Sequence, residues 1–446
     1  MKNRFRCIAV CFGLFVALGS GIALFSQSPV QEPIGKRVAK DELKFVVIVS
    51  RHGVRSPTGK LDQLNQYSRQ PWPVWSVPPG YLTEHGARLM TLFGAYDREL
   101  LVSQGLFAAS GCADAEHIRI VADSDQRTRE TGKALAAGLE PGCTIAVSAL
   151  PEGTEDPLFH PLGTGVGTPD RSLATAAISG RIGGNPEGLS VAYRPQLAAL
   201  EEVLLACNPG ANCLSQAGPA PKSIFDIPSS LAPGSGSHLA ELRTPLSTAA
   251  TMAENFLLEY TEGMDAANVG WGRVDIRNLR ELMQLHTANV DIAQRPSYIA
   301  RIQSSNLLSH VLRSIDQAAS GHPVAGALTK AEDHLLVLAG HDTNIASIAG
   351  TLGLSWIIDG RRDDTPPGGA LVFELWKTSG TSEYAIRTYY MAQALDQMRN
   401  ATPLTLANPP ERVPVYVPGC GRGDGSCEWN AFQKTVQAAI DSGFVK

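Results

Sequence analysis

Several features that mark whole classes of protein are missing from this sequence. Its 446 residues include no run of five or more basic residues, and the formal net charge is −5. Binding to a nucleic-acid backbone needs a basic surface, so we expect no nucleic-acid partner. Beyond the N-terminus, no apolar stretch is long enough to span a bilayer. The sequence also lacks internal repeats and the C-x2-C spacing that zinc sites use.

The overall composition is that of a globular enzyme. Hydrophobic residues make up 43% and charged residues 18% of the chain, unlike a disordered protein. The length suits one large domain or two smaller ones. The glycine-rich stretch 163–167 lacks the G-x-G-x-x-G spacing of dinucleotide-binding turns and is predicted to be a loop. Because the net charge is negative, any phosphate chemistry must use a few focused cations.

The N-terminus has the pattern of an export signal. Three cations within the first six residues are followed by an apolar run from 8 to 25. We therefore predict a signal peptide over 1–26, a polar leader over 27–43, and a periplasmic or secreted location. The small-residue pattern near residue 26 is not a clean cleavage site, so an uncleaved membrane anchor is the alternative.

The cysteines agree with export. Beyond the expected signal there are six, and they fall as three sequence-neighbouring pairs: Cys112, Cys143, Cys207, Cys213, Cys420 and Cys427. The C-x5-C and C-x6-C spacings enclose turn residues and indicate surface loops closed by disulfides. A zinc site is disfavoured because no histidine lies close to these cysteines in the sequence.

Apolar runs alternate with helical patterns along the chain. Strands are predicted at 44–50, 118–122, 334–340, 370–377 and 384–391. Helices are predicted at 84–101, 128–139, 170–182, 190–206, 246–263 and 274–319. Strands separated by helices indicate an α/β fold, with a mixed, mainly parallel sheet flanked by helices. The middle block is predicted to be an inserted, mostly α-helical domain at 155–293, between two α/β segments at 44–154 and 294–446.

Three polar clusters follow three of the apolar strands. They lie at 51–58, 123–129 and 341–344, each at what would be the carboxyl end of its strand. Sites in open α/β sheets assemble at these ends, so residues far apart in the sequence are expected to converge there.

The chemistry that suits these clusters is phosphoryl transfer. A phosphoryl group carries charge on three oxygens, and the planar fork of arginine bonds two oxygens at once. Arg51, Arg55 and Arg127 can supply three such forks, although spacing alone does not choose between Arg127 and Arg129. Thr58 can add a hydroxyl donor.

The predicted nucleophile is His52. Neighbouring arginines disfavour a second positive charge, so they should lower the pKa of His52 and keep its ring neutral below neutral pH. Asp342 is the candidate proton donor to the leaving alcohol. Its ordinary pKa is about 3.9, and a bound phosphate dianion would raise that value. Both tendencies predict an acid optimum.

These residues resemble a known family, the histidine acid phosphatases, and more closely their bacterial periplasmic phytase and acid glucose-1-phosphatase branch. The family motif R-H-G-x-R-x-P occurs at 51–57, and the distal H-D motif is His341-Asp342. Further similarity lies at 156–159, 270–273, 365–369 and 397–399. The resemblance covers essentially the whole chain after the signal.

The resemblance implies a fold, a mechanism and residue roles. The site would lie in a cleft between an α/β domain and an α-helical domain, without metal or cofactor. His52 would carry a phosphohistidine, Asp342 would protonate the leaving group, and His341 would contact the phosphate. Arg127 would be the third family arginine. The implied disulfides are Cys112–Cys143, Cys207–Cys213 and Cys420–Cys427.

Two departures bear on the substrate. The most phytate-active relatives carry a lysine directly after the threonine, whereas Gly59 occupies that position here and Lys60 follows. A disulfide bridge between the helical domain and the C-terminal region in some relatives lacks its cysteines. Lys60 and Glu254, which matches a substrate-pocket position of the branch, are the candidate pocket residues. We expect a monomer acting on a small-molecule phosphate monoester.

Several functions compete on this pattern. The first is an acid phosphatase acting on phytate or sugar phosphates, with a glucose-1-phosphatase-type preference as its variant. The second is a phosphomutase of the wider superfamily, which export argues against. The third is a non-catalytic periplasmic binder of phosphate esters. Asp342 argues against a binder, because a binder needs no proton donor and an anion would weaken it.

Overall fold

The structure is a computed structural model that describes residues 40–59, 61–207 and 220–446. The predicted signal peptide, Lys60 and Cys213 lie outside the described residues, as does most of the predicted leader. Among the described helices, none has both the length and the apolar character needed to cross a bilayer.

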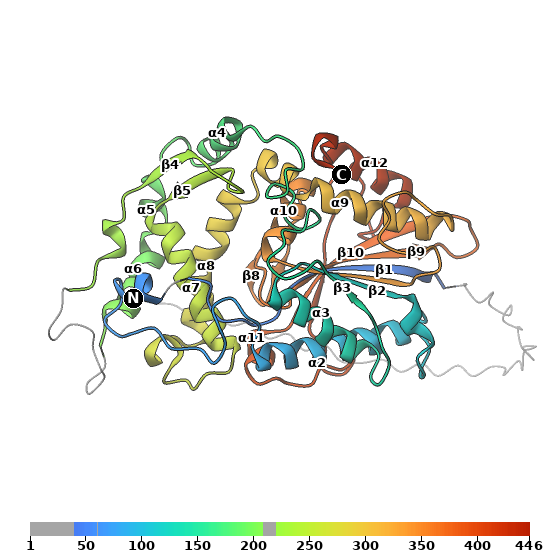
Figure 1. Cartoon of the computed structure of the whole chain (residues 1–446), viewed down its shortest axis with the longest axis horizontal. Coiled ribbons are helices and arrows are strands. Elements are labelled where there is room, and N and C mark those ends of the chain that lie inside the picture. Colours follow the sequence, from blue (N-terminus) through green and yellow to red (C-terminus); the bar gives the residue numbers. More distant parts are fainter. Residues whose placement is uncertain (1–39, 60, 208–219) are drawn as a thin grey trace, which may run out of the picture. The chain divides into compact units, whose positions relative to one another are not determined.

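A mixed sheet forms the centre of the fold (Figure 1). Its strand order is β11-β10-β9-β1-β6-β2-β3, with β12 pairing to β10. The parallel strands are β1 (Glu42–Arg51), β6 (Leu335–Gly340), β2 (Ile118–Ala122) and β3 (Val147–Ser148). The antiparallel strands are β9 (Ala370–Lys377), β10 (Tyr384–Ala392), β11 (Glu411–Pro414) and β12 (Cys427–Glu428). The predicted α/β class and mixed sheet are confirmed, and all five predicted strands are present.

Alternation of side chains along β1 explains why the sheet has helices on both faces. Phe45, Val47 and Val49 belong to one hydrophobic core, whereas Val46 and Ile48 belong to another. The first core includes α9 (Ser297–Ser320), α10 (Asp342–Leu352) and α12 (Trp429–Ala439). The second includes α2 (Glu84–Ser103) and α3 (Gln126–Leu139). Figure 1 shows these two groups on opposite sides of the sheet.

The middle of the chain builds a third core from helices. Its main helices are α4 (Arg171–Arg181), α5 (Gly188–Ala192), α6 (Arg194–Leu205), α7 (Pro245–Thr261) and α8 (Ile276–Ala293). A hairpin of β4 (Ser230–Pro233) and β5 (Ala240–Arg243) lies between α6 and α7 in the chain. Residues from Lys40 onward form one compact unit. The predicted boundaries at 154/155 and 293/294 stay predictions.

Short elements complete the fold. They are α1 (Leu61–Asn65), α11 (Leu395–Arg399), β7 (Ile357–Ile358), β8 (Arg361–Arg362) and 3-10 turns at Ala113–His117, Ile224–Asp226, Val269–Gly272 and Ser442–Phe444.

Most bounds lie within two residues of the sequence prediction, and three differences have an identifiable cause or change the number of elements. The strand β1 begins at Glu42, inside the predicted leader, because Leu43 is buried as part of the sheet core. The helix predicted at 190–206 is divided at Tyr193 into α5 and α6. The helix predicted at 274–319 is divided at Pro296, whose ring and missing N–H do not fit a helix interior.

Two of the three disulfides implied by the resemblance are present. Cys112–Cys143 links the segment before β2 to the turn after α3, and Cys420–Cys427 closes a short loop at β12. The third, Cys207–Cys213, stays a prediction because Cys213 lies outside the described residues.

Candidate active site

The carboxyl ends of the three central parallel strands meet at one edge of the sheet. Arg51, the last residue of β1, lies opposite Gly340, the last residue of β6. The His52 N–H donates to Gly340 O at 2.9 Å. The Asp123 N–H, directly after β2, donates to Ala339 O at 3.0 Å. The predicted convergence of the three polar clusters therefore follows from strand register.

The His52 ring is held in one tautomer by the backbone carbonyl of the next residue. Its Nδ1 lies 2.8 Å from Gly53 O, and a carbonyl oxygen only accepts, so Nδ1 carries the proton. Burial, followed by the charges of Arg51, Arg55 and Arg127, lowers the pKa of His52 well below its ordinary value. The ring is therefore neutral, with a lone pair on Nε2. The sequence predicted the arginine effect but not burial, which is the larger cause.

The loop after β1 is pressed against α2. A side-chain carbon on Gly53 would lie 2.8 Å from Met90 Cγ, and one on Gly86 would lie 2.1 Å from Val54 O. The Gly53 N–H also donates to Thr131 Oγ1 at 3.0 Å, which joins the loop to α3. Both glycines are required by this close approach. The loop that carries His52 and Arg55 is thus fixed by two helices.

Arg51 is fully buried and bridges two carboxylates. Its Nη1 donates to Thr365 O at 2.6 Å, and its Nη2 pairs with Glu254 of α7 and, at 3.4 Å, with Asp342 Oδ2. Arg55 also contacts Glu254, with Nη2 3.4 Å from Oε1. Glu254 of α7 therefore lies beside Arg51 and Arg55, while its role in the substrate pocket, which the resemblance implies, stays a prediction.

Asp342 begins α10 and stands beside these charges. Burial by itself would raise the pKa of Asp342, but the charges of Arg51, His286 and Arg55 together outweigh it and hold that pKa below its ordinary value. Burial likewise opposes ionisation of Glu254, yet Arg55 and Arg51 keep its pKa well below the usual range. A third member of this group is His286 of α8, whose ring nitrogen lies within 4.8 Å of both carboxylates. Both carboxylates are therefore ionised in the free site.

The third arginine is chosen by contacts that spacing did not reveal. Arg127 Nη2 lies 3.4 Å from His341 Nδ1 and pairs with Asp125. Its Nη1 lies 3.5 Å from Gly80 O. These contacts place Arg127, rather than Arg129, at the edge of the sheet that carries His52.

The two remaining predicted site residues are Thr58 and Lys60. Thr58 is exposed, and it lies near Arg127: a side-chain carbon on Gly80 would be 3.3 Å from Thr58 Cγ2 and 3.6 Å from Arg127 Nη1. Lys60 lies outside the described residues, so its predicted place in the pocket stays a prediction.

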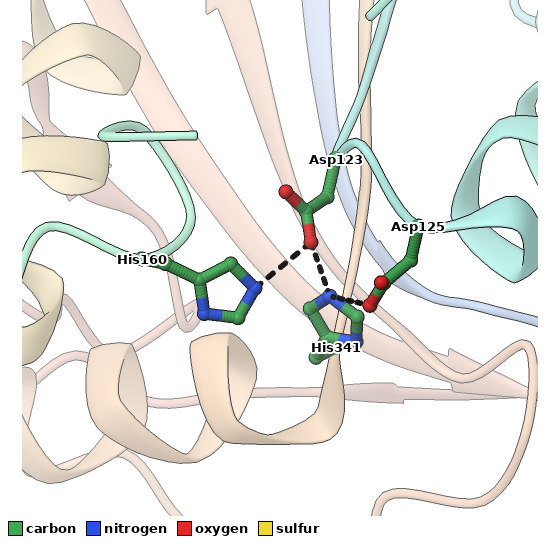
Figure 2. Close-up of side chains that lie close together, drawn as sticks. All are labelled: Asp123, Asp125, His160 and His341. Atoms are coloured by element: carbon green, nitrogen blue, oxygen red, sulfur yellow. Dashed lines mark hydrogen bonds and ion pairs between the residues drawn. The ribbon is translucent and has the colours of Figure 1, made fainter. Parts of the chain in front are cut away.

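His341 is hydrogen-bonded to the buried carboxylate of Asp123. Its Nε2 donates to Asp123 Oδ2 at 2.6 Å, and His160 Nε2 donates to the same oxygen at 2.8 Å (Figure 2). Burial opposes ionisation of Asp123, but its bonds to His160 and His341 keep its pKa well below the usual range. The Asp123 side chain is fully buried, so it orients His341 without reaching a substrate.

Sequence reasoning missed two histidines of this site. His160 directly follows the family-like segment at 156–159 but comes after no predicted strand, so strand-end logic did not select it. His286 recurs with Leu279, Leu282 and Met283 on the buried face of α8, a pattern that predicts core packing. Only tertiary contacts distinguish it from a core residue.

Four of these side chains also have the ligand types that zinc binds. Donor atoms of Asp123, Asp125, His160 and His341 lie within 4.8 Å of one another. However, both histidines already share protons with Asp123, and Arg127 neutralises Asp125. We propose no metal here, and the predicted absence of metal and cofactor stays a prediction.

Comparison with known proteins agrees with this geometry. Residues 42–185 and 240–391 match the family model of the histidine phosphatase superfamily (branch 2). Phytase AppA of Escherichia coli (strain K12) is 36% identical over 405 residues, which cover 89% of this chain and 92% of AppA. Glucose-1-phosphatase of Providencia rettgeri is 29% identical over 410 residues, covering 90% and 92% of the two chains.

A solved structure extends the agreement to the fold. Hafnia alvei phytase in complex with myo-inositol hexakis sulphate matches with a TM-score of 0.80 at 33% identity, covering 93% of this chain and 100% of that chain. Sequence identity, fold and the arginine-lined histidine point to the same chemistry. This chain therefore belongs to branch 2 of the histidine phosphatase superfamily and is a phosphoric monoester hydrolase.

Proposed function

We propose that this enzyme hydrolyses phosphate monoesters in two steps, through a phosphohistidine on His52. In the first step the lone pair of His52 Nε2 attacks phosphorus, an N–P bond forms and the ester P–O bond breaks. Asp342 gives its proton to the departing alkoxide. In the second step water attacks phosphorus, its proton passes to the Asp342 carboxylate, and the N–P bond breaks to release inorganic phosphate.

The main support for this proposal is the environment of the His52 ring. The ring is neutral and its Nδ1 is bonded, which leaves Nε2 to attack. The Nε–H groups of Arg51, Arg55 and Arg127 are buried and find no hydrogen-bond partner among the described residues. An unsatisfied buried donor costs about 1–3 kcal/mol. Three such donors around one imidazole are what the oxygens of a phosphoryl group would satisfy.

The proposed acid is ionised before substrate binds. Arg51 lowers the pKa of Asp342 in the free site, so its proton must come with the substrate or from acidic solvent. The negative charge of a bound phosphate dianion disfavours ionisation of the Asp342 carboxyl. The dianion also pairs with Arg51 and so weakens the attraction between Arg51 and Asp342, and both effects raise the pKa of Asp342. Turnover of esters with poor leaving groups is therefore expected to be highest at acid pH.

For substrates, we propose phytate and sugar phosphates, the classes named in the relatives phytase AppA and glucose-1-phosphatase. A periplasmic or secreted location is proposed as well. It is supported by the export-like N-terminus and by two disulfides, which persist in oxidising compartments.

The nucleophile is tested by His52→Ala. The purified enzyme and the variant would be given p-nitrophenyl phosphate, phytate and glucose 1-phosphate across the acid and neutral pH range. We expect turnover by the wild type and at most residual turnover by the variant, with radiolabelled phosphate trapped on the wild type alone. Tight binding of phosphate esters without turnover by the wild type would contradict the proposal and favour a binding protein.

The proton donor is tested by Asp342→Asn. Activated esters such as p-nitrophenyl phosphate leave without protonation, so the variant should retain much of its activity on them. Esters of ordinary alcohols need the proton, so their kcat should fall by roughly 10²–10⁴. Equal losses on both ester types would show that Asp342 is not the donor.

A further inference from the structure

Two imidazoles share a single carboxylate oxygen at the edge of the site. His160, in the loop between β3 and α4, donates from Nε2 to Asp123 Oδ2 at 2.8 Å, and His341 donates to the same oxygen at 2.6 Å. The two ring centroids are 5.1 Å apart. Figure 2 shows the two rings approaching Asp123 from different elements.

The loop that carries His160 is anchored. Asn344 Nδ2 donates to Phe159 O at 2.9 Å, and Asn306 Nδ2 donates to Pro157 O at 2.8 Å. The His160 N–H donates to Asp156 O at 2.7 Å. Anchors on α10 and α9 therefore fix the His160 backbone beside His341.

The shared oxygen determines which protons His341 carries. A carboxylate oxygen only accepts, so His341 Nε2 is protonated and, in the neutral ring, Nδ1 has a lone pair. That lone pair faces an N–H donor, Arg127 Nη2, at 3.4 Å. A phosphate oxygen is an acceptor and cannot bond a lone pair. His341 must therefore gain a second proton to bind phosphate through Nδ1.

We propose that His160 is a positioning residue: by sharing the Asp123 oxygen with His341, it sets the pH range over which His341 holds the second proton needed to bind phosphate. This inference rests on the proposed phosphatase function and on the phosphate contact that the family resemblance implies for His341. His160 itself does not touch the reacting atoms. It acts on His341 through its charge and through its bond to Asp123.

The charges around His160 give the direction of the effect. Burial opposes protonation of His160, but its bond to Asp123 and the negative charges of Asp123, Asp125 and Glu155 together raise the pKa of His160. Its side chain is 40% exposed, so it exchanges protons with solvent, whereas the side chain of His341 is 6% exposed. The other titratable or charged groups facing it are Asp125, Glu155, Asp156 and, across the adjoining pocket, His238.

A protonated His160 opposes a second proton on His341. Burial is the largest cause that lowers the pKa of His341, and the nearby charges of Arg127 and His160 lower it further. The bond to Asp123 acts in the opposite direction but does not cancel them. Removing the His160 charge should therefore raise the pKa of His341. Phosphate binding should then persist to higher pH.

The test uses two substitutions that remove the charge in different ways. His160→Gln keeps a neutral N–H donor at similar reach to Asp123, whereas His160→Ala removes the donor as well. KM for p-nitrophenyl phosphate and Ki for inorganic phosphate are expected to rise as pH rises and His341 loses its second proton. In both variants we expect this rise to occur about one pH unit higher than in the wild type. The kcat on this activated ester should change less than threefold, because His160 does not reach the reacting atoms.

Controls separate the possible outcomes. His322→Gln changes an exposed histidine in the loop that leads to the opposite end of β6, and it should leave both profiles unchanged. Ring-nitrogen NMR of His341 gives a second measurement, in which both His160 variants should show a raised pKa. A His160→Gln profile identical to wild type would overturn the inference and leave His160 a structural hydrogen-bond donor. Failure of the proposed function would appear separately, as full activity of His52→Ala.

Discussion

At the scale of single residues, the site assigns a different task to each cation. Arg51 is buried and holds Glu254 and Asp342, so it controls the charge of the proposed acid. Arg127 instead lies against His341 and Asp125. Because a guanidinium stays charged at every relevant pH, these residues give fixed positive charge where a lysine would be a single flexible point.

The choice of Arg127 over Arg129 can be tested with a matched pair. Arg127→Lys keeps the charge but loses the planar fork, and we expect kcat/KM for p-nitrophenyl phosphate to fall by roughly 10²–10³. Arg129→Lys, two residues along the same helix, should change kcat/KM less than threefold because the two side chains point to different faces. Steady-state kinetics at the optimum pH measures both. Similar losses in the two variants would show that the assignment is incorrect.

At the scale of elements, the start of α2 and the loop after β1 behave as one unit. Thr83 caps α2 by accepting from the Gly86 N–H at 2.9 Å, and its own N–H donates to Val54 O at 3.1 Å. Thr83 therefore joins the first turn of α2 to the loop after β1. The position of this loop, and of His52 with it, depends on α2, which lies outside the motif at 51–57.

Gly86→Ala should disturb this contact. The added carbon would lie 2.1 Å from Val54 O, so the loop or the helix must move. We expect a loss of about 1–3 kcal/mol in the free energy of unfolding, with kcat lowered as well. Gly180→Ala in α4 is the matched control, because nothing lies within 4 Å of its added carbon. It should stabilise the protein by about 0.5–1 kcal/mol. Denaturant unfolding of both variants measures the effects, and equal behaviour would contradict the steric argument.

At the scale of the whole molecule, stability and activity are expected to favour acid pH together. Glu259 in α7 is 1% exposed, and its carboxyl group accepts from the Gly270 N–H at 2.8 Å. Burial raises the pKa of Glu259 from 4.5 to about 8. Asp97, another buried carboxyl, has its pKa raised to about 8 by burial as well. Both groups prefer to be protonated in the folded chain.

The sign of the pH effect follows from this preference. A carboxyl whose folded pKa is raised adds stability that is complete below its unfolded pKa and is lost as pH rises toward the folded pKa. For Glu259 that window runs from about 4.5 to about 8. Thermal melting of wild type should therefore show a falling Tm across this window. Glu259→Gln keeps an oxygen acceptor without the charge, so its Tm should fall less. A variant with the same pH dependence as wild type would exclude this contribution.

How far the sequence predicts this protein depends on the range of each interaction. Side-chain alternation, turn residues and the R-H-G-x-R string are local patterns, so the sequence alone predicts the strands, most helices and a candidate catalytic motif. The meeting of the three polar clusters was predicted as well, since parallel strands place their carboxyl ends at one edge. Helix 274–319 was predicted as continuous because its apolar pattern continues past Pro296.

What the sequence determined by itself is therefore the set of strands and the candidate reacting groups at their ends. Tertiary structure alone decided which of Arg127 and Arg129 meets His341, that Glu254 pairs with Arg51 across 203 positions, and that His160 and His286 join the site. The physical reason is that these contacts depend on how separate hydrophobic cores pack, and no local periodicity records that packing.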